Sequence, residues 1–196
     1  MLKINGGEYR RRLIDGPPDQ ERSRPMPARV KESLFNMLRG WFEDAHVLDL
    51  FAGVGTMGLE AVSLGASEVL MIEQDRDIHA ILQGNIDQLD CGDRCRAVLS
   101  DALGPAPLAQ APRPVNIIFM DPPYAIMKQE PLHQAVLAQA ARLVPIMAEK
   151  AWLVLRTPEP LSETERVIEG LQGPEMHQYA EDMHVHLYFR DQTPVA

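Results

Sequence analysis

The chain has 196 residues, 45% of them hydrophobic, and a formal net charge of −9. This length fits one globular domain with a small extension. Its apolar runs are all shorter than the roughly 20 residues that span a bilayer. The first residues, Met-Leu-Lys-Ile-Asn-Gly-Gly, differ from a signal peptide in lacking an apolar segment and a cleavage site. We therefore expect a cytoplasmic protein without membrane contact.

The charge is unevenly distributed along the chain. The first 40 residues hold nine Lys and Arg residues against five acidic ones, so the remainder is strongly acidic. A basic arm on an acidic body suits contact with the phosphates of a nucleic acid. The candidates for such contacts are Arg10, Arg11, Arg12, Arg24, Arg29 and Lys31.

The predicted elements begin with a β-hairpin over residues 2–14, turning at Asn5-Gly6-Gly7. A proline-rich connector over 15–27 separates it from a helix over 28–41. Residues 1–27 are thus expected to extend a main domain over 28–196. Within that domain we predict strands at 47–50, 68–72, 97–99, 115–120 and 151–155, helices at 57–64, 77–89 and 130–144, a variable stretch at 103–114 and a closing strand pair ending at 185–189. This alternation indicates a parallel sheet covered by helices on both faces.

A glycine-rich turn follows the first predicted strand of the main domain. Gly53, Gly55 and Gly58 satisfy the G-x-G-x-x-G pattern, and Glu73 follows 20 residues after Gly53, where its carboxylate could accept ribose hydroxyls. The pattern alone admits a nicotinamide dinucleotide or S-adenosylmethionine. Asp49, just before the turn, favours the second, because it would repel a pyrophosphate and attract an ammonium or sulfonium group.

Four acidic residues fall at the carboxyl ends of predicted strands: Asp49, Glu73, Asp101 and Asp121. Ligands of open α/β sheets bind at this edge. Asp101, with Ala102 beside it, is placed to receive an adenine amino group. The expected contacts of S-adenosylmethionine are Asp49, Phe51, Ala52, Gly53, Gly55, Gly58, Glu73, Asp101 and Ala102.

The candidate catalytic residues are Asp121, Pro122, Pro123 and Tyr124, which follow an apolar strand. An exocyclic amine of a base is a poor nucleophile because its lone pair is delocalised into the ring. The Asp121 carboxylate and the Pro122 carbonyl could hold both N–H bonds of such an amine, on a loop that the prolines stiffen. Tyr124 offers a ring on which a flipped base could stack. Neither a metal nor a covalent nucleophile is required.

These residues resemble the class I methyltransferases that act on amino nitrogens, and more narrowly the RsmD family of bacterial 16S rRNA guanine-N2 methyltransferases. The likeness covers nearly the whole chain and includes Ile4-Asn5-Gly6-Gly7, Arg24-Pro25, Arg29-Val30-Lys31-Glu32-Ser33-Leu34-Phe35-Asn36, Val47 to Gly53, Asn85 and Ile118 to Tyr124. The chain departs from the family pattern at Met26-Pro27-Ala28, where Thr-x-Asp is usual.

The resemblance implies a Rossmann-like α/β fold, with a seven-stranded, mostly parallel sheet whose last strand is antiparallel. It also implies S-adenosylmethionine as cofactor and 16S rRNA, free or in a small-subunit particle, as partner of a monomeric enzyme. The same four catalytic residues would equally serve an N6-adenine methyltransferase on DNA or RNA, or a protein glutamine methyltransferase. A nicotinamide-binding oxidoreductase and a catalytically silent RNA-binding factor are further alternatives.

Three other groups of residues have structural interpretations. Cys91 and Cys95 are expected in a polar loop, because a disulfide framework is atypical of a cytosolic chain of this size. His184 and His186 alternate along a strand and are predicted to lie on its surface rather than to bind a metal. Trp41 and Trp152 are expected to pack against apolar neighbours.

Overall fold

The computed structural model describes residues 1–18 and 26–191. Its elements in chain order are β1 (Leu2–Lys3), β2 (Leu13–Ile14), α1 (Ala28–Met37), β3 (His46–Asp49), α2 (Thr56–Ser63), β4 (Glu68–Glu73), α3 (Arg76–Leu89), β5 (Cys95–Leu99), α4 (Ala106–Gln110), β6 (Val115–Met120), α5 (Tyr124–Met127), α6 (Glu130–Leu143), the 3-10 helix η1 (Val144–Ile146), β7 (Met147–Thr157), β8 (Gln172–Ala180) and β9 (Met183–Asp191). The helices of this part of the chain are each too short or too polar to cross a membrane.

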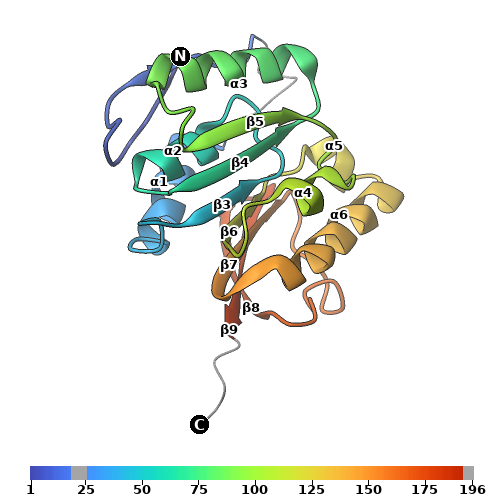
Figure 1. Cartoon of the computed structure of the whole chain (residues 1–196). Coiled ribbons are helices and arrows are strands. Elements are labelled where there is room, and N and C mark those ends of the chain that lie inside the picture. Colours follow the sequence, from blue (N-terminus) through green and yellow to red (C-terminus); the bar gives the residue numbers. More distant parts are fainter. Residues whose placement is uncertain (19–25, 192–196) are drawn as a thin grey trace.

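A seven-stranded sheet in the order β5-β4-β3-β6-β7-β9-β8 forms the centre of the molecule (Figure 1). Neighbouring strands from β5 to β7 are parallel, whereas β9 runs antiparallel to both β7 and β8. The predicted α/β class, with a seven-stranded, mostly parallel sheet and an antiparallel last strand, is therefore confirmed. The carboxyl ends of β3, β4, β5 and β6 consequently lie along one edge.

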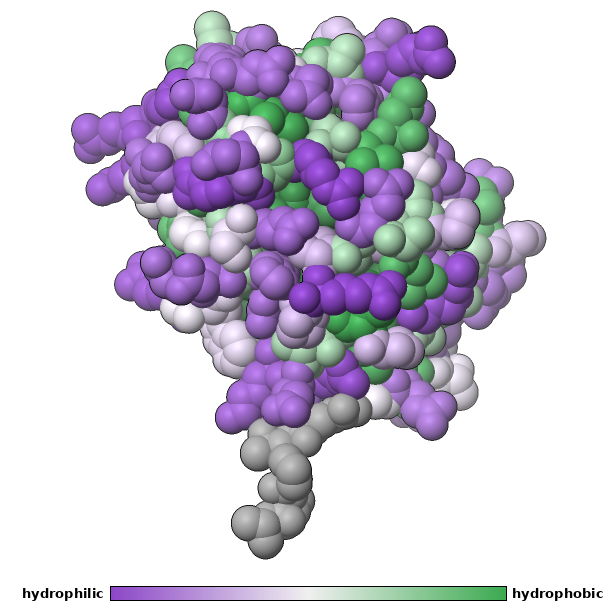
Figure 2. All heavy atoms as spheres, in the orientation of Figure 1, coloured by the Kyte–Doolittle hydropathy of each residue, from purple (hydrophilic) through white to green (hydrophobic). Residues whose placement is uncertain are grey.

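Helices cover both faces of this sheet, as the alternation of elements predicted. Residues of α1, α2 and α3 pack with Val47 in one core cluster, and residues of α4 and α6 pack with Leu48 in the other. Adjacent residues of β3 thus point to opposite cores, which is why the central strands are apolar throughout. On the face drawn in Figure 2, hydrophilic residues predominate and apolar ones appear only in patches.

Most predicted boundaries lie within a few residues of the observed ones, and β6 has the predicted bounds. The strand predicted at 151–155 is longer, because β7 pairs along its length with β6 and β9. Two helices were not predicted: α4, inside the stretch interpreted as variable, and α5, which begins at Tyr124. Elements of four and five residues are too short for a hydrophobic period to be visible.

The N-terminal hairpin is present, but its predicted turn is wrong. The paired strand residues are Leu2 with Ile14 and Lys3 with Leu13, the Ile4 N–H still donates to the Arg12 carbonyl at 3.0 Å, and residues 5–12 form a loop. The N–H groups of Asn5 and Gly6 donate to the Glu60 carboxylate of α2, at 2.9 and 2.7 Å to Oε1. The backbone of the expected tight turn is therefore bonded to a helix 55 residues away in sequence rather than across the hairpin.

The surroundings of two residue pairs differ from the prediction. Cys91 lies in the loop between α3 and β5 as expected, but it and Cys95, the first residue of β5, are buried with their sulfur atoms 3.5 Å apart. His184 and His186 are buried, not on the surface of their strand. The Nε2 atom of His186 lies 2.9 Å from Thr157 Oγ1, and burial lowers the pKa of His186 to about 4.

The aromatic residues pack as expected. Trp41 and Trp152 meet edge to face with ring centroids 5.8 Å apart, and Phe189 joins both. Among residues 1–18 and 26–191, no group of three or more His, Cys, Asp or Glu side chains is arranged to hold a metal ion.

Candidate active site

The structure brings the four predicted acidic residues to one edge of the sheet. Asp49 and Glu73 are the last residues of β3 and β4, Asp121 follows β6, and Asp101 lies two residues after β5. Since these strands are adjacent and parallel, their ends are neighbours although the residues are far apart in sequence. The edge is therefore strongly acidic at its centre.

Asp49 is the most deeply buried of these acids, with 1% of its surface exposed. Its Oδ2 atom accepts the N–H of Gly58 at 3.0 Å, in the first turn of α2. Its Oδ1 atom is buried and has no hydrogen-bond partner within the described part of the chain. Burial, together with the charges of Asp121 and Glu73, raises the pKa of Asp49 to about 8, although the hydrogen bond from Gly58 lowers it. A buried acceptor of this kind suits a cationic ligand.

The glycines of the turn are packed closely against neighbouring elements, which leave no space for a side chain at Gly55 or Gly58. Gly55 has a φ of 91°, and an added Cβ would lie 2.5 Å from Leu82 of α3. A Cβ on Gly58 would lie 2.5 Å from the sulfur of Met71 in β4. The packing of α3 and β4 against the turn therefore already requires glycine at these two positions.

Glu73 connects the end of β4 to this turn. Its Oε2 atom accepts the N–H of Gly53 at 2.9 Å, and its Oε1 atom accepts the N–H of Asp75 at 2.7 Å. Asp75 in turn caps α3 by accepting the N–H groups of Asp77 and Ile78. Each Glu73 oxygen retains a second lone pair, so the expected ribose contact stays open.

The remaining predicted cofactor residues line the same edge. Phe51 is half-buried, while Ala52 and Ala102 are buried. Asp101 is exposed, and its Oδ1 atom accepts the N–H of Leu103 at 2.8 Å. The Asp101 carboxylate therefore faces solvent, which leaves the predicted adenine contact as an expectation.

The Asp121-Pro122-Pro123-Tyr124 loop leaves β6 and enters α5, with Pro123 at the N-cap position. The Asp121 side chain is 15% exposed and forms an ion pair with Arg156 of β7. The Arg156 guanidinium carbon also lies 5.2 Å from the centroid of the Tyr124 ring. Burial raises the pKa of Asp121, and the Arg156 charge opposes that rise.

Arg156 is a site residue that the sequence pattern did not indicate. It follows the apolar run Trp152 to Leu155, and the register pairs Leu155 with Met120, the residue before Asp121. A charged residue directly after an apolar strand was the available signal. It was not informative, however, without the knowledge that β7 lies beside β6.

The basic residues predicted to contact nucleic acid separate into different environments. Arg10, Arg11 and Arg29 are exposed. The Arg12 guanidinium donates to the carbonyls of Gln88, at 2.5 Å, and Leu89. Arg24 lies outside the described residues.

The assignment of Lys31 to nucleic-acid contact is wrong. Its side chain is 6% exposed, and its Nζ atom lies 2.7 Å from Glu60 Oε2 and 3.2 Å from the carbonyl of Lys3. Lys31 is therefore an internal partner of Glu60.

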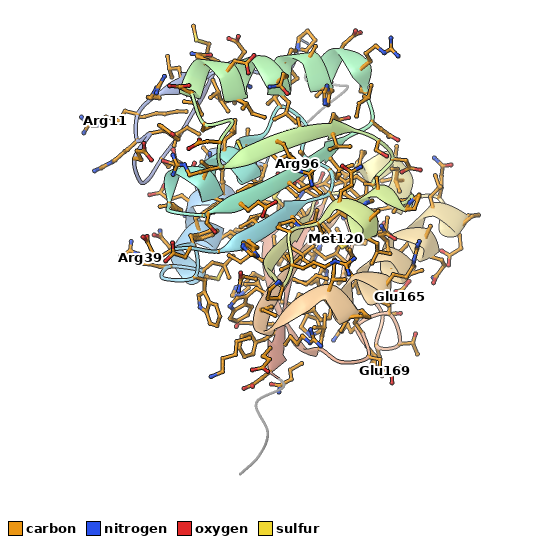
Figure 3. The ribbon with its side chains drawn as sticks, in the orientation of Figure 1. Arg11, Arg39, Arg96, Met120, Glu165 and Glu169 are labelled. Atoms are coloured by element: carbon orange, nitrogen blue, oxygen red, sulfur yellow. The ribbon has the colours of Figure 1, made fainter. Side chains whose placement is uncertain are left out.

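The loop of residues 5–12, which carries Arg10 and Arg11, lies far from the candidate catalytic loop of residues 121–124. Figure 3 places Arg11 at the outer left of the molecule, well separated from Met120 at the end of β6. The reason is that residues 5–12 pack at the C-terminal end of α2, where Ser63 accepts the N–H of Tyr9 at 2.9 Å. Arg10 and Arg11 are thus remote from the carboxylate edge.

The order of strands and the residues at their carboxyl ends define a Rossmann-like class I methyltransferase fold. The model of the family described as "Conserved hypothetical protein 95" matches residues 2–188. The chain belongs to this family, which is the RsmD family that its motifs indicated.

Individual relatives agree with this family. The chain is 42% identical over 124 residues to ribosomal RNA small subunit methyltransferase D of Escherichia coli K12, and 35% identical over 112 residues to the putative rRNA methyltransferase YlbH of Bacillus subtilis. These matches cover 63% and 56% of the chain but only 61% and 60% of the two relatives. A solved structure of the putative methyltransferase yhhF from Escherichia coli is similar over 98% of this chain and 99% of its own, with a TM-score of 0.76 and 32% identity.

Proposed function

We propose that this protein transfers a methyl group from S-adenosylmethionine to the exocyclic N2 amine of a guanine in 16S rRNA, free or within a small-subunit particle. One observation carries the proposal: the unpartnered, buried Oδ1 atom of Asp49 lies at the same sheet edge as the Asp121-Pro122-Pro123-Tyr124 loop. The first feature suits a cationic cofactor, and the second suits an amine acceptor. Such a substrate would place the protein in the cytoplasm.

The residues of this edge fit S-adenosylmethionine. When bound, that cofactor supplies an activated methyl group on a cationic sulfur. Asp49 would compensate positive charge through its Oδ1 atom while keeping its bond to Gly58. Glu73, fixed by Gly53 and Asp75, would accept hydroxyl groups, and Asp101 would face the adenine amine. A pyrophosphate would be repelled by the same carboxylates, which argues against a nicotinamide dinucleotide.

The catalytic loop would activate the amine by holding it. The Asp121 carboxylate and the Pro122 carbonyl accept its two N–H bonds, which favours a pyramidal nitrogen with an available lone pair. Tyr124 supplies a ring for stacking on the extruded base, an interaction worth roughly 1–3 kcal/mol. The remaining acceleration would come from alignment of the methyl donor with the amine nitrogen at this edge of the sheet.

The name of the Escherichia coli relative supports a small-subunit rRNA substrate, and the family resemblance supports guanine N2. N6-adenine methylation by the same loop is the second candidate, since both reactions need an amine held by a carboxylate and a carbonyl. The two differ in product, because one yields N2-methylguanosine and the other N6-methyladenosine.

The deciding experiment measures methylated nucleosides by mass spectrometry after incubation with small-subunit particles that lack the modification. We expect N2-methylguanosine with the wild type. Asp121→Asn should reduce the rate by about 10³-fold or more, because a preorganised acceptor is removed, while S-adenosylhomocysteine affinity changes only a few-fold. The exposed Asp87 of α3 provides a charge-matched control, Asp87→Asn, which should retain full activity. A wild type that yields N6-methyladenosine, or no methylated base, would overturn the proposal.

A further inference from the structure

The candidate active site contains a buried carboxylate, Asp49, beside a partly buried one, Asp121, and Arg156 forms an ion pair with Asp121. Asp49 from β3 and Asp121 after β6 are close enough for the charge of Asp121 to raise the pKa of Asp49. Arg156 from β7 pairs with Asp121, whereas Asp49 has no such partner among residues 1–18 and 26–191. Arg156 is itself buried, with 6% of its side chain exposed. A buried arginine of this kind needs a reason, because desolvating its charge is costly.

The contacts of Arg156 supply that reason. Its Nε atom faces Oδ1 of Asp121, and its guanidinium carbon lies 5.2 Å from the Tyr124 ring centroid, within the range of a cation–π contact. One side chain on a rigid strand thus touches both functional side chains of the catalytic loop. The register fixes this arrangement, since Met120 pairs with Leu155 and Arg156 pairs with Val185 of β9.

We propose that Arg156 is a positioning residue for the reaction: it occupies one carboxylate oxygen of Asp121, leaves the other for the substrate amine, and holds the Tyr124 ring in place. This inference rests on the proposed function. Arg156 does not contact the reacting atoms. Its effect is to keep Asp121 both ionised and fixed in direction, so that the amine meets an acceptor rather than a protonated acid.

The charged and titratable groups around Asp121 indicate how the removal of Arg156 would change the pKa of Asp121. Among the described residues they are Asp49 from β3, Arg156 from β7 and Tyr124 from α5. Burial disfavours the charge on Asp121, and Arg156 is the group that favours it. Removal of Arg156 should therefore raise the pKa of Asp121 and widen the pH range in which the amine meets a protonated acid.

The test uses three variants of the full chain: Arg156→Gln, Arg156→Lys and the control Arg190→Gln. Arg190 is also a buried arginine, 9% exposed. Its backbone lies opposite Ala151 of β7 in the strand register, and its guanidinium donates to the Met147 carbonyl. Its replacement removes a buried guanidinium at the other end of the strand. A merely structural role for Arg156 predicts similar behaviour of Arg156→Gln and Arg190→Gln.

Carboxyl NMR with ¹³C-labelled aspartate provides the first readout and needs no activity. The Asp121 signal is assigned by its disappearance in Asp121→Asn. We expect Arg156→Gln to raise the Asp121 midpoint by at least about one pH unit, and Arg156→Lys and Arg190→Gln to leave it within a few tenths. An Asp121 midpoint that does not move in Arg156→Gln would overturn the inference.

The pH dependence of methyl transfer provides the second readout. The acidic limb of kcat should move upward in Arg156→Gln by the same amount as the carboxyl midpoint, with about tenfold loss at pH values below both midpoints and partial recovery at higher pH. Arg156→Lys should keep the limb of the wild type but lower kcat several-fold, because an ammonium lacks the planar guanidinium. A uniform loss at all pH values in Arg156→Gln would contradict the proposal.

A double variant keeps the test decisive if Arg156→Gln does not fold. In Asp121→Asn the arginine has no carboxylate to position, so adding Arg156→Gln should change the residual turnover less than twofold. A further large loss would show that Arg156 acts independently of Asp121. A wild type without methyltransferase activity would refute the proposed function, whereas the carboxyl titration would still decide whether Arg156 controls Asp121.

Discussion

Asp49 and Glu60 are both buried carboxylates with 1% of their surface exposed, yet their surroundings differ. Glu60 is fully partnered: it accepts the N–H groups of Asn5 and Gly6 and pairs with Lys31. Asp49 has one oxygen bonded to Gly58, and its other oxygen finds no partner among the residues that the structure describes. A buried charge whose acceptors are all filled from within the chain stabilises the fold. A buried charge with an open acceptor is costly unless a ligand completes it.

The first and largest effect is expected at the partnered carboxylate. Glu60→Gln retains acceptors for the Asn5 and Gly6 N–H groups but leaves Lys31 as an uncompensated buried charge. We expect the free energy of unfolding to fall by roughly 3–5 kcal/mol, measured by urea denaturation.

The matched control replaces both partners. Lys31→Met with Glu60→Gln removes the unpaired charge and should recover more than half of the missing stability. If Glu60→Gln unfolds at the same urea concentration as the wild type, the ion pair is not what holds the N-terminal loop on α2.

At the open carboxylate we expect the opposite sign for stability. Asp49→Asn keeps an acceptor for the Gly58 N–H but removes the charge. S-adenosylhomocysteine affinity should fall about 10- to 100-fold, as expected when a charged hydrogen bond worth roughly 1.5–3 kcal/mol is removed. Calorimetric titration measures this decrease, and Asp87→Asn should bind like the wild type.

The raised pKa of Asp49 also sets a pH window. Its contribution to the stability of the ligand-free protein is present below the ordinary value of 3.8 and is lost as pH rises through about 8. At pH 9 the free energy of unfolding of Asp49→Asn, measured by urea denaturation, should therefore exceed that of the wild type by on the order of 2 kcal/mol. The difference should be smaller at pH 5. In the wild type, cofactor binding at pH 7 should release up to one proton. Equal heats in buffers of different ionisation enthalpy would refute this.

A smaller effect should distinguish the two basic regions of the N-terminal segment. Arg10 and Arg11 lie on the loop beside the C-terminal end of α2, whereas Arg29 lies in the first turn of α1. Replacing an arginine that binds a phosphate should reduce the salt slope of RNA binding by about 0.7–0.9 and weaken binding several-fold. Comparing Arg10→Ala with Arg11→Ala, Arg29→Ala and the exposed α6 control Arg142→Ala by filter binding shows which region meets the RNA. Unchanged salt slopes in all of these variants would refute the prediction that the basic N-terminal segment contacts the phosphates of RNA.

Local patterns in the sequence were sufficient for most of the fold. The alternation of apolar strands with amphipathic helices predicted the parallel sheet, and the positions of Asp49, Glu73, Asp101 and Asp121 after strands predicted their common edge. These features depend on residues that are near one another in the chain or on the general rule that parallel strands end together.

The sequence did not reveal contacts between distant segments. It predicted a tight turn at Asn5-Gly6-Gly7, but the Glu60 carboxylate draws these N–H groups to α2. It assigned Lys31 to RNA, although the same carboxylate binds that ammonium inside the protein. His186 was expected on the surface, because a histidine in an apolar strand does not indicate which face is covered.

What the sequence by itself determined is therefore the set of elements, their class and the acidic edge, because hydrophobic period, glycine and proline act locally. Only the tertiary structure decided which charges are internal pairs and which remain open. That distinction depends on strand order, which places Arg156 beside Asp121, and on the packing of the N-terminal loop, which brings Lys31 and the loop backbone to Glu60 but leaves Asp49 with an unfilled oxygen.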